Sequence, residues 1–300
     1  MLKVCYVFQD KYPWDVRVEK IMDSLVNNGF ECHILSRNRE RMPKTEKINN
    51  NLTIHRLPAL PYNWMTSVMN IPAFFSPVWI GEMVMLIKKI KADILIVRDL
   101  PLAPAALLSA RITKCPIIMD MAENYPAMIQ DTWKYRGPGP FDYIIRNPCF
   151  LRIMEKYVVP RMDGVFVVSD YSKKRVSKLG LDPSHIWIVS NTPRIDNIDT
   201  NNEIYCRELA KIKAKTSLMI LYVGGLEESR GLDIVIRALP IVHKQIPSAT
   251  FIVVGEGSAK DKLIKLSSYL RIQDRVVFTG WVDNRHVSSI IKSSDVCIVP

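Results

Sequence analysis

Short runs rich in Val and Ile alternate with segments of helical period along the chain. In the first half the apolar runs predict strands, and residues 18–26 place their apolar side chains on one helical face. The strands are predicted at residues 4–8, 32–35, 52–57, 94–97, 116–119, 165–168 and 186–189, with further helices at 102–112 and 151–159. Strands that alternate with helices in this way predict a mostly parallel sheet that is covered on both faces.

The same pattern starts again in the second half. A polar stretch at 191–202 contains turn formers and few apolar residues, which indicates a linker. Strands are then predicted at 218–223, 250–254, 275–279 and 296–299, with helices at 232–245, 260–270 and 286–292, the first of them kinked by Pro240. We therefore predict two Rossmann-like, doubly wound α/β domains at 1–190 and 218–300, joined by a linker and first helix at 191–217. Because the chain ends directly after a predicted strand, we expect the second domain to be incomplete.

The composition fits two folded domains and favours anionic partners. Apolar residues make up 48% of the chain and charged residues 24%, which suits a folded core. The formal net charge of +11 favours nucleotides, phospholipid surfaces or nucleic acid, although excess Lys and Arg also keep proteins soluble. No nucleic-acid-binding module is recognisable, so nucleic acid is not an expected partner. The six cysteines lack the spacing of a zinc site, so no metal is expected and a reducing cytoplasm is favoured.

One apolar segment raises the question of a membrane. Glu82 is the only charged residue from 65 to 87, and the segment is long enough to span a bilayer. It also contains two prolines and a glycine, so we interpret it as one or two helices packed on a sheet, with an apolar face that touches lipid. Lys88, Lys89 and Lys91 follow it and suit an anionic membrane surface. The expected location is cytoplasmic, peripheral on the inner face of the membrane.

The strongest local signal follows the predicted strand at 218–223. Gly224 and Gly225 come directly after that strand, and Arg230 and Gly231 open the next predicted helix. Glycine lets backbone N–H groups approach a phosphate closely, a helix N-terminus favours an anion, and arginine pairs with a diphosphate through a bidentate fork. The combination predicts a phosphate site, against the alternative of an ordinary turn with a surface arginine.

The next two strands of the second half also end in glycine-containing turns. Gly255 and Gly257 follow one of them, a pattern that any tight turn between a strand and a helix can use. Trp281, Val282 and Asp283 follow the other. The first two of these side chains are predicted to flank a nucleobase, and a place for Trp281 in the core or in a domain interface is an equally good interpretation.

In the first half, charged and polar residues follow strands of buried type. Arg98 and Asp99 follow one strand, and Asp120, Glu123 and Asn124 follow the next. Carboxylates and amides at a strand end are poor core residues. Parallel sheets bind ligands at the carboxyl ends of their strands, so these residues predict a polar cleft.

Two further positions belong to the same part of the fold. Asp15 and Arg17 open the first predicted helix, where Asp15 has the alternative role of a helix cap. Asn191 ends the last predicted strand of the first half and is expected to face a cleft between the domains.

Taken in order, these motifs resemble the retaining GT-B glycosyltransferases of family four, over the whole chain. No single motif is decisive, but the ordered set is fairly specific. The matching positions are Tyr12-Pro13, Asp15-Val16-Arg17, Asn28-Gly29, Asp120, Glu123-Asn124-Tyr125-Pro126, Val167-Val168-Ser169, Leu179-Gly180, Asn191, Gly224-Gly225, Arg230-Gly231, Gly255-x-Gly257 and Phe278-x-Gly280-x-Val282.

Three departures from the family bear on activity. The family often has a His that contacts the donor sugar where this chain has Ala122, so that contact is expected from one of the two following residues. The family often has Arg where this chain has Gly225, which leaves Arg230 to carry the diphosphate alone. The Glu-x7-Glu segment that holds the donor sugar and ribose would begin just beyond Pro300. We therefore expect a C-terminally truncated chain that is inactive as it stands.

The resemblance implies transfer of a sugar from a nucleotide diphosphate sugar to a saccharide or lipid-linked acceptor, with retention of configuration and without a metal or other cofactor. Such chemistry would serve cell-surface polysaccharide or glycolipid synthesis, with a hinge at 191–203 closing the two halves. The implied catalytic residues are Arg230 and Glu123. The implied donor-binding residues are Gly224, Gly225, Arg230, Gly231, Gly255, Gly257, Trp281, Val282 and Asp283, and the implied acceptor-binding residues are Asp15, Arg17, Arg98, Asp99, Asn124 and Tyr125.

Two other functions stay open. A nucleotide-sugar epimerase of GT-B fold would turn over its substrate without an acceptor, and a non-catalytic subunit would bind a nucleotide sugar without turnover. A dinucleotide-dependent dehydrogenase is less favoured, because no GxGxxG motif follows Phe8.

Overall fold

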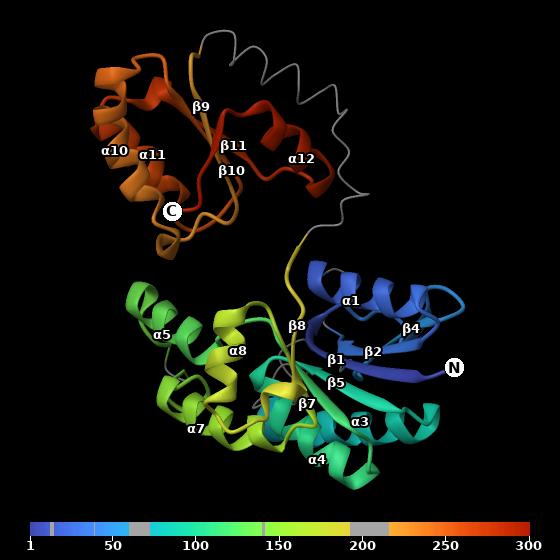
Figure 1. Ribbon diagram of the computed structural model, residues 1–300. Coiled ribbons are helices and arrows are strands. Elements are labelled where there is room, and N and C mark those ends of the chain that lie inside the picture. The colour runs from blue at the N-terminus through green and yellow to red at the C-terminus, as the bar shows by residue number, and fades with distance from the viewer. Residues whose placement is uncertain (13–14, 39, 60–72, 140–141, 193–215) are drawn as a thin grey trace. The chain divides into compact units, whose positions relative to one another are not determined.

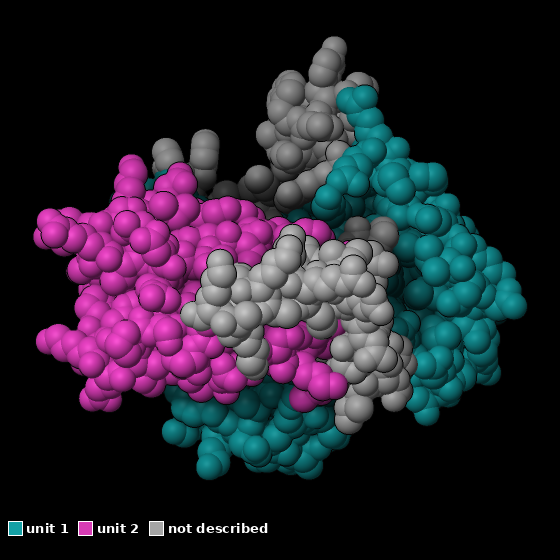
Figure 2. All heavy atoms as spheres, turned by 90° about the horizontal axis from the view of Figure 1, so that it is seen from above, with its two compact units in different colours: residues 1–191 teal, residues 192–300 magenta. Residues whose placement is uncertain are grey.

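The structure is a computed structural model that describes residues 1–12, 15–38, 40–59, 73–139, 142–192 and 216–300. The chain divides into two compact units, Met1–Asn191 and Thr192–Pro300, which Figure 2 colours separately. Each unit has its own sheet and its own hydrophobic core. Most of the predicted linker and hinge, residues 193–215, lies outside the described part of the chain.

Unit 1 is built on one eight-stranded sheet (Figure 1). Its strands are β1 (Lys3–Lys11), β2 (Glu31–Arg37), β3 (Thr45–Lys47), β4 (Leu52–Arg56), β5 (Ile94–Arg98), β6 (Ile117–Met121), β7 (Gly164–Val167) and β8 (Ile186–Ile188). They lie in the order β3-β4-β2-β1-β5-β6-β7-β8, and neighbours are parallel except β3, which pairs antiparallel with β4. The chain builds outward from β1 in one direction and from β5 in the other, so the order reverses between these two strands. Ligands of open parallel sheets bind at such a reversal, outside the carboxyl ends of the strands.

Helices cover both faces of this sheet (Figure 1). The helix α1 (Val16–Asn27) lies on one face, and α3 (Pro77–Ile90), α4 (Ala103–Thr113) and α7 (Pro148–Val158) lie on the other. The remaining helices of four or more residues that the structure describes in unit 1 are α5 (Tyr125–Arg136), α6 (Asp142–Ile145) and α8 (Asp170–Ser177).

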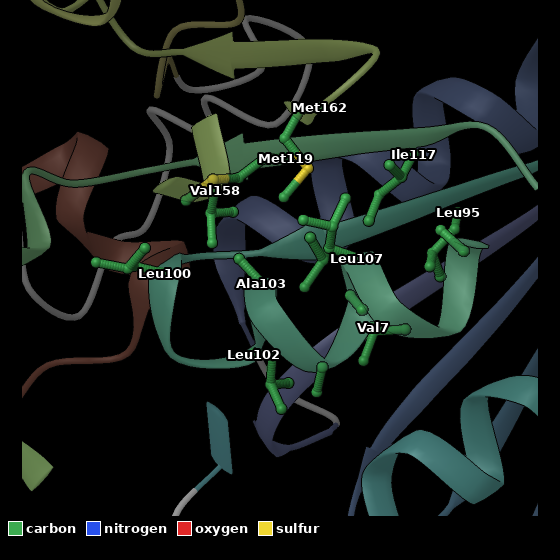
Figure 3. Close-up of a cluster of buried hydrophobic side chains, with 14 of the residues drawn as sticks. Val7, Leu95, Leu100, Leu102, Ala103, Leu107, Ile117, Met119, Val158 and Met162 are labelled. Carbon is green, nitrogen blue, oxygen red and sulfur yellow. The ribbon is translucent and has the colours of Figure 1, made fainter. Parts of the chain in front are cut away.

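The larger core of unit 1 lies between the sheet and the helices α3, α4 and α7. Figure 3 shows side chains of this cluster around α4, among them Val7, Leu95, Leu107 and Met119. Because side chains alternate along a strand, the neighbours of these strand residues point to the other face, where Tyr6 packs in a second cluster with α1.

The apolar segment at 65–87 is described from residue 73 onward. There η1 (Ala73–Phe75) leads into α3, whose first turn is capped by the Ser76 hydroxyl and opened by Pro77. Trp79 and Met83 of α3 are fully buried in the core of unit 1, as expected for a helix packed on a sheet. Among the helices that the structure describes, none combines the length and the apolar character needed to cross a bilayer.

Unit 2 repeats the alternation around a smaller, fully parallel sheet. Its strands are β9 (Met219–Val223), β10 (Thr250–Val254), β11 (Val276–Gly280) and β12 (Val296–Cys297), in the order β11-β10-β9-β12. The helices α10 (Leu232–Gln245) and α11 (Lys260–Tyr269) pack on one face, and α12 (Asn284–Ser293) packs on the other (Figure 1). Pro240 lies inside α10. The order reverses between β9 and β12, so the loop after β9 occupies the position that binds ligands in open parallel sheets.

Candidate functional site

Charged side chains meet where the carboxyl ends of β1 and β5 lie next to each other. Asp15 caps α1, because its Oδ1 accepts hydrogen bonds from the backbone of Arg17 at 3.0 Å and of Val18 at 3.0 Å. The same oxygen accepts a hydrogen bond from the Arg98 guanidinium at the end of β5. Asp15 therefore caps the helix, as its alternative interpretation predicted, and also joins α1 to β5.

A buried ion pair links α1 to the end of β6. Arg17 Nη2 lies 2.6 Å from Asp120 Oδ1, and Arg17 Nε donates to both carboxylate oxygens at 3.0 and 3.1 Å. Asp120 is 0% exposed and the Arg17 side chain is 5% exposed. Tyr6 of β1 donates from its hydroxyl to Asp120 Oδ2 at 2.7 Å. Each oxygen of this buried carboxylate thus has a donor.

The second end of the Arg17 guanidinium holds the last residues of unit 1. Arg17 Nη1 donates to the carbonyl of Val189 and to Asn191 Oδ1, each at 2.7 Å. With all three nitrogens engaged and little exposed surface, Arg17 organises the strand ends from within. Arg17 thus has a buried partner that lies 103 residues away in the sequence, and its predicted contact with an acceptor stays a prediction.

Tyr6 is a member of this network that the sequence did not single out, because it stands inside an apolar strand. A tyrosine in a buried strand needs a hydrogen-bond partner for its hydroxyl, so its presence in an apolar strand could have indicated a polar network. Burial raises the pKa of Tyr6 well above its ordinary range, and the neighbouring Asp120 adds to the rise. Tyr6 is therefore protonated and able to donate at neutral pH.

Asp99 lies directly after β5 and makes two contacts. Its Oδ1 accepts a hydrogen bond from the Ala122 backbone at 3.2 Å, and its Oδ2 lies 3.5 Å from Arg98 Nε. Burial raises its pKa to about 7; Arg98 opposes the rise, and Asp120 and Glu123 add to it. The Asp99 carboxyl therefore changes protonation near neutral pH.

The three predicted residues after β6 lie at the start of α5. Glu123 and Asn124 are exposed, and Asn124 Oδ1 caps the helix by accepting from the Ala127 backbone at 3.4 Å. Tyr125 is half-buried and packs against the core of unit 1. Electrostatic coupling of Asp99 with Glu123 and with Tyr125 places these side chains in the same region of unit 1.

A cavity of about 240 Å³ lies within unit 1 beside this network. It opens between α1 and the ends of β7 and β8, and Ile21, Leu25 and Phe166 give it largely apolar walls. Arg17 and Asn191 border it, whereas Asp99 and Glu123 do not. Among the described residues no group of three His, Cys, Asp or Glu side chains is placed to hold a metal ion.

In unit 2 the predicted phosphate loop is fastened by backbone hydrogen bonds. The Gly224 amide donates to the Val254 carbonyl and the Leu226 amide to the Glu256 carbonyl, each at 3.0 Å. The Gly225 amide between them has no acceptor among the described residues. The Tyr222 hydroxyl donates to the Gly225 carbonyl at 2.9 Å, a second tyrosine contact that the sequence did not indicate. Of the two amides that were predicted to face a phosphate, one is already bonded and one is available.

Gly255 and Gly257 are explained by close packing of two backbones. A Cβ atom on Gly255 would lie 1.9 Å from the Gly224 carbonyl oxygen, and one on Gly257 would lie 2.4 Å from the Leu226 carbonyl oxygen. Gly255 also has φ +137, which side chains disfavour. These two glycines let the loops after β9 and β10 pack closely. This packing alone accounts for glycine at both positions, whether or not they contact a donor.

Arg230 stands at the point where the loop meets α10. It ends the short helix η6 (Glu228–Arg230), its side chain is exposed, and it forms no ion pair with any described residue. Gly231 follows in the left-handed conformation with φ 70, and no side chain caps the first turn of α10. Uncapped N–H groups, the positive end of a 14-residue helix and a free guanidinium together attract an anion.

The residues after β11 separate into different environments. Trp281 is 71% exposed, whereas Val282 is buried in the core between the sheet and α12. The Asp283 carbonyl accepts from the His286 backbone at 2.9 Å in the turn that leads into α12. Trp281 is therefore available to a ligand, and the predicted contact of the Val282 side chain with a nucleobase is replaced by a place in the core.

Two family models match the chain. Residues 15–192 match Glycosyltransferase Family 4, and residues 208–300 match Glycosyl transferases group 1. The first match alone covers more than half of the chain. The two matched segments correspond to the two units, since the first ends and the second begins close to the boundary after Asn191.

Curated relatives agree with these families at low identity. The alpha-D-kanosaminyltransferase of Streptomyces kanamyceticus is 20% identical over 299 residues, which covers 94% of this chain and 74% of the relative. An uncharacterized glycosyltransferase of Methanocaldococcus jannaschii is 34% identical over 82 residues, which is 27% of this chain. That match spans only 21% of the Methanocaldococcus protein.

Solved structures share the fold. Sucrose-phosphate synthase from Thermosynechococcus elongatus matches with a TM-score of 0.73 at 13% identity, over all of this chain and 75% of the other. HepE of Anabaena in complex with UDP matches with a TM-score of 0.66 at 12% identity, over 99% of this chain and 73% of the other. These likenesses confirm the predicted GT-B architecture of two Rossmann-like domains. With both segments matched in order on this fold, the chain belongs to glycosyltransferase family 4.

Proposed function

We propose that this protein transfers a sugar from a nucleotide diphosphate sugar to a saccharide or lipid-linked acceptor, with retention of configuration. Unit 2 would bind the donor and the strand ends of unit 1 would bind the acceptor. Family membership supports the reaction class. The structures of HepE with UDP and with UDP-glucose support a uridine diphosphate sugar as the first donor to test.

The observation that carries the proposal is the group of N–H donors and positive charge after β9. The Gly225 amide and the Arg230 guanidinium lack partners among the described residues, and no side chain caps the first turn of α10. A diphosphate gains negative charge as its bond to the sugar breaks, and fixed donors at that position stabilise the charge as it develops. Arg230 and the helix N-terminus supply positive charge without a metal, so the proposal includes activity in the presence of EDTA.

The direct test is binding and turnover with Arg230 changed. Calorimetry with UDP should show binding by the wild type, and Arg230→Ala should weaken it by about 10- to 100-fold, because a charge-assisted pair contributes about 1.5–3 kcal/mol. Arg230→Lys keeps the charge and loses the fork, so it should fall between the two. Arg237→Ala on α10, an exposed arginine paired with Asp233, is the matched control and should bind UDP normally. Equal affinity in all four proteins would remove Arg230 from the site.

A turnover screen separates the proposed transferase from its alternatives. UDP-glucose and UDP-N-acetylglucosamine are each incubated with octyl glucoside or octyl N-acetylglucosaminide. Transfer products are read by mass spectrometry, and epimers, which have the same mass as the donor, are read by NMR. An octyl disaccharide supports the proposal. A changed nucleotide sugar without acceptor indicates an epimerase of the same fold, and UDP binding without any product indicates a non-catalytic subunit.

We also propose that the protein binds an anionic membrane through the outer faces of α3, α4 and α7 and takes its acceptor there. These helices lie side by side on one face of unit 1 (Figure 1), with α4 in contact with both neighbours. The segments 77–91, 103–114 and 148–161 contain eight Lys and Arg residues but only Glu82 and Glu155 as acids, and both acids are largely buried in ion pairs. Large exposed apolar side chains lie among the cations: Phe75, Met85, Leu108, Ile112, Phe150, Ile153 and Tyr157.

A surface of this kind fits a bilayer that carries negative headgroups. The cations attract the headgroups at a distance, and the apolar side chains enter the interface once contact is made. Flotation with phosphatidylglycerol–phosphatidylcholine vesicles should recover the wild type, and recovery should fall with added salt. Ile153→Asp on α7 should reduce recovery severalfold, while Tyr269→Asp, at an 81% exposed position on α11, should not. Equal recovery with pure phosphatidylcholine would refute the preference for an anionic surface.

A further inference from the structure

The backbone of Asp99 is held in a conformation that its side chain disfavours. Asp99 has φ 60 and ψ 167, a region that is almost restricted to glycine. Lys91 and Lys114 also have positive φ, but their ψ values of 58 and 30 place them in the ordinary left-handed conformation at helix ends. Asp99 has no such role in ending a helix, since it stands between β5 and η2 (Leu100–Leu102).

The surroundings of Asp99 explain why the conformation persists. The Asp99 amide donates to the Asp120 carbonyl at 3.0 Å, and the three residues that follow are buried. Its carboxyl accepts from the Ala122 backbone, as described above. Neighbouring structure therefore fixes the residue on both sides, while 25% of the side chain stays open to solvent at the strand ends.

Burial of the Asp99 carboxyl disfavours its ionised form. Burial raises its pKa, and Arg98, the nearest cation, is shared with Asp15. The groups that act on it from neighbouring elements are Arg98 of β5, Asp120 of β6, Glu123 before α5, Tyr125 of α5 and Tyr6 of β1. Two of these five are carboxylic acids and two are tyrosines, so Arg98 is the one cation among them.

Neither the strained backbone nor the buried carboxyl of an aspartate at position 99 is needed to hold the strand ends together. Asparagine would offer the same oxygen to the Ala122 amide without a titratable group, and it tolerates positive φ better than most residues. A carboxyl group at this position, part-exposed at the reversal of strand order, matches the requirements of a ligand contact better than those of a scaffold.

We propose that Asp99 is an acceptor-binding residue whose ionised carboxylate accepts a hydrogen bond from a hydroxyl group of the saccharide acceptor. This inference rests on the transferase function proposed above. A carboxylate binds a hydroxyl more strongly than a neutral carboxylic acid does. Acceptor affinity should therefore increase as the pH rises through about 7, while donor affinity should not follow the same curve.

The test compares wild type, Asp99→Asn and Asp131→Asn, the last at an exposed carboxylate of α5. With the octyl glycoside that the wild type glycosylates, KM for the acceptor should fall between pH 6 and pH 8. Asp99→Asn should raise that KM about tenfold at pH 8 and flatten its pH dependence, with KM for the UDP-sugar and UDP affinity unchanged. Asp131→Asn should behave as wild type.

A stability measurement needs no acceptor and separates a ligand contact from a scaffold. Because the folded pKa of Asp99 is raised, the protein loses stability as the pH rises from about 4 through about 7, and asparagine removes that loss. Asp99→Asn should therefore raise Tm by about 3–6 °C at pH 8 and by less at pH 4. Asp99→Gly, which fits the backbone, serves as the second variant and should show the same loss of acceptor affinity.

The outcomes are distinguishable. A wild type that glycosylates neither octyl glycoside overturns the proposed function in this form. A wild type that is active, with the same acceptor KM in Asp99→Asn across the pH range, overturns the inference about Asp99 alone. A lower Tm for Asp99→Asn at pH 8 also overturns it, because it would show that the carboxyl is needed by the fold.

Discussion

Side-chain ion pairs hold the strand ends together in unit 1, whereas backbone hydrogen bonds do so in unit 2. In unit 1, side chains hold them: Arg17 pairs with Asp120, and Arg98 pairs with Asp15. In unit 2, backbone groups hold them, through bonds such as that from the Gly224 amide to the Val254 carbonyl. Among the described residues of unit 2, the strand ends contain no counterpart of the buried ion pair in unit 1.

The difference predicts how each unit should respond to substitution. The charged side chains at the strand ends of unit 1 already form ion pairs with one another. Removing one of them leaves its partner unpaired and lowers the stability of the unit. Glycine loops in unit 2 bring backbones together and leave Arg230 exposed and unpaired with any described residue. We therefore expect substitutions in unit 1 to act first on stability, and substitutions at exposed positions of unit 2 to act first on binding.

The largest expected effect comes from breaking the buried pair. Arg17→Met leaves the fully buried Asp120 without its cation and should destabilise unit 1 by about 3–5 kcal/mol. Urea unfolding combined with hydrogen exchange of individual peptides measures the loss and assigns it to a unit. The double variant Arg17→Met/Asp120→Leu should recover much of it, because no unpaired charge remains. If both variants unfold at the same urea concentration, the pair is not the source of the stability.

Two glycines test the backbone organisation of unit 2. Gly255→Ala forces a Cβ against the Gly224 carbonyl at a positive φ and should destabilise unit 2 by about 3 kcal/mol. Gly225→Ala is the matched control, since a Cβ there meets nothing within 4 Å, and it should change stability by less than about 0.5 kcal/mol. Thermal unfolding checks both. Equal effects of the two substitutions would contradict the close packing of the loops.

Substitution of one tyrosine in each unit compares the two units directly. Tyr6→Phe removes a donor from a buried carboxylate and should cost about 2 kcal/mol, whereas Tyr222→Phe removes a donor from the neutral Gly225 carbonyl and should cost about 1 kcal/mol. Denaturant midpoints at constant m-value measure both. A larger loss for Tyr222→Phe would reverse the comparison.

The smallest expected effect lies at two histidines on the neighbouring strands β2 and β4 of unit 1. His33 Nδ1 lies 3.1 Å from His55 Nε2, and burial lowers the pKa of His55 to about 4, with His33, Lys89 and Lys44 adding to the shift. Since this folded pKa lies below the ordinary value of 6.5, the protein should lose stability as the pH falls from about 6.5 toward 4.

Replacing His55 tests this part of the sheet. His55→Gln should reduce the acid loss by less than about 1 kcal/mol, because the site is only partly buried, and should leave UDP binding unchanged. Thermal unfolding at pH 4.5 and pH 7.5 provides the measurement. A change in UDP affinity would show that this region is coupled to the donor site.

Strands and most helices could be predicted because apolar periodicity is a local property. The predicted ranges for α10 and β10 coincide with those in the structure. The edge strand β3 was not predicted, since Thr45, Glu46 and Lys47 carry no apolar alternation and pair with β4 only in the folded sheet. The helix α5 was also missed, because it has no clear apolar face.

The site was predictable only where a single segment carries the signal. Arg230 after the paired glycines could be found in this way, as could Arg98 and Asp99 at a strand end. The burial of Arg17 and the close approach of Gly255 to Gly224 depend on segments that are distant in sequence, so residue type alone gave no indication of them. Likewise, the strained backbone of Asp99 is imposed by β6, which the sequence around Asp99 does not reveal.

The two bonds from Arg17 to Val189 and Asn191 also have a mechanical consequence. A pull on the chain where it leaves unit 1 is transmitted through a rigid, planar guanidinium to a carboxylate in the interior, so the exit segment cannot bend independently of the sheet. The segment up to Asn191 is therefore mechanically part of the sheet of unit 1.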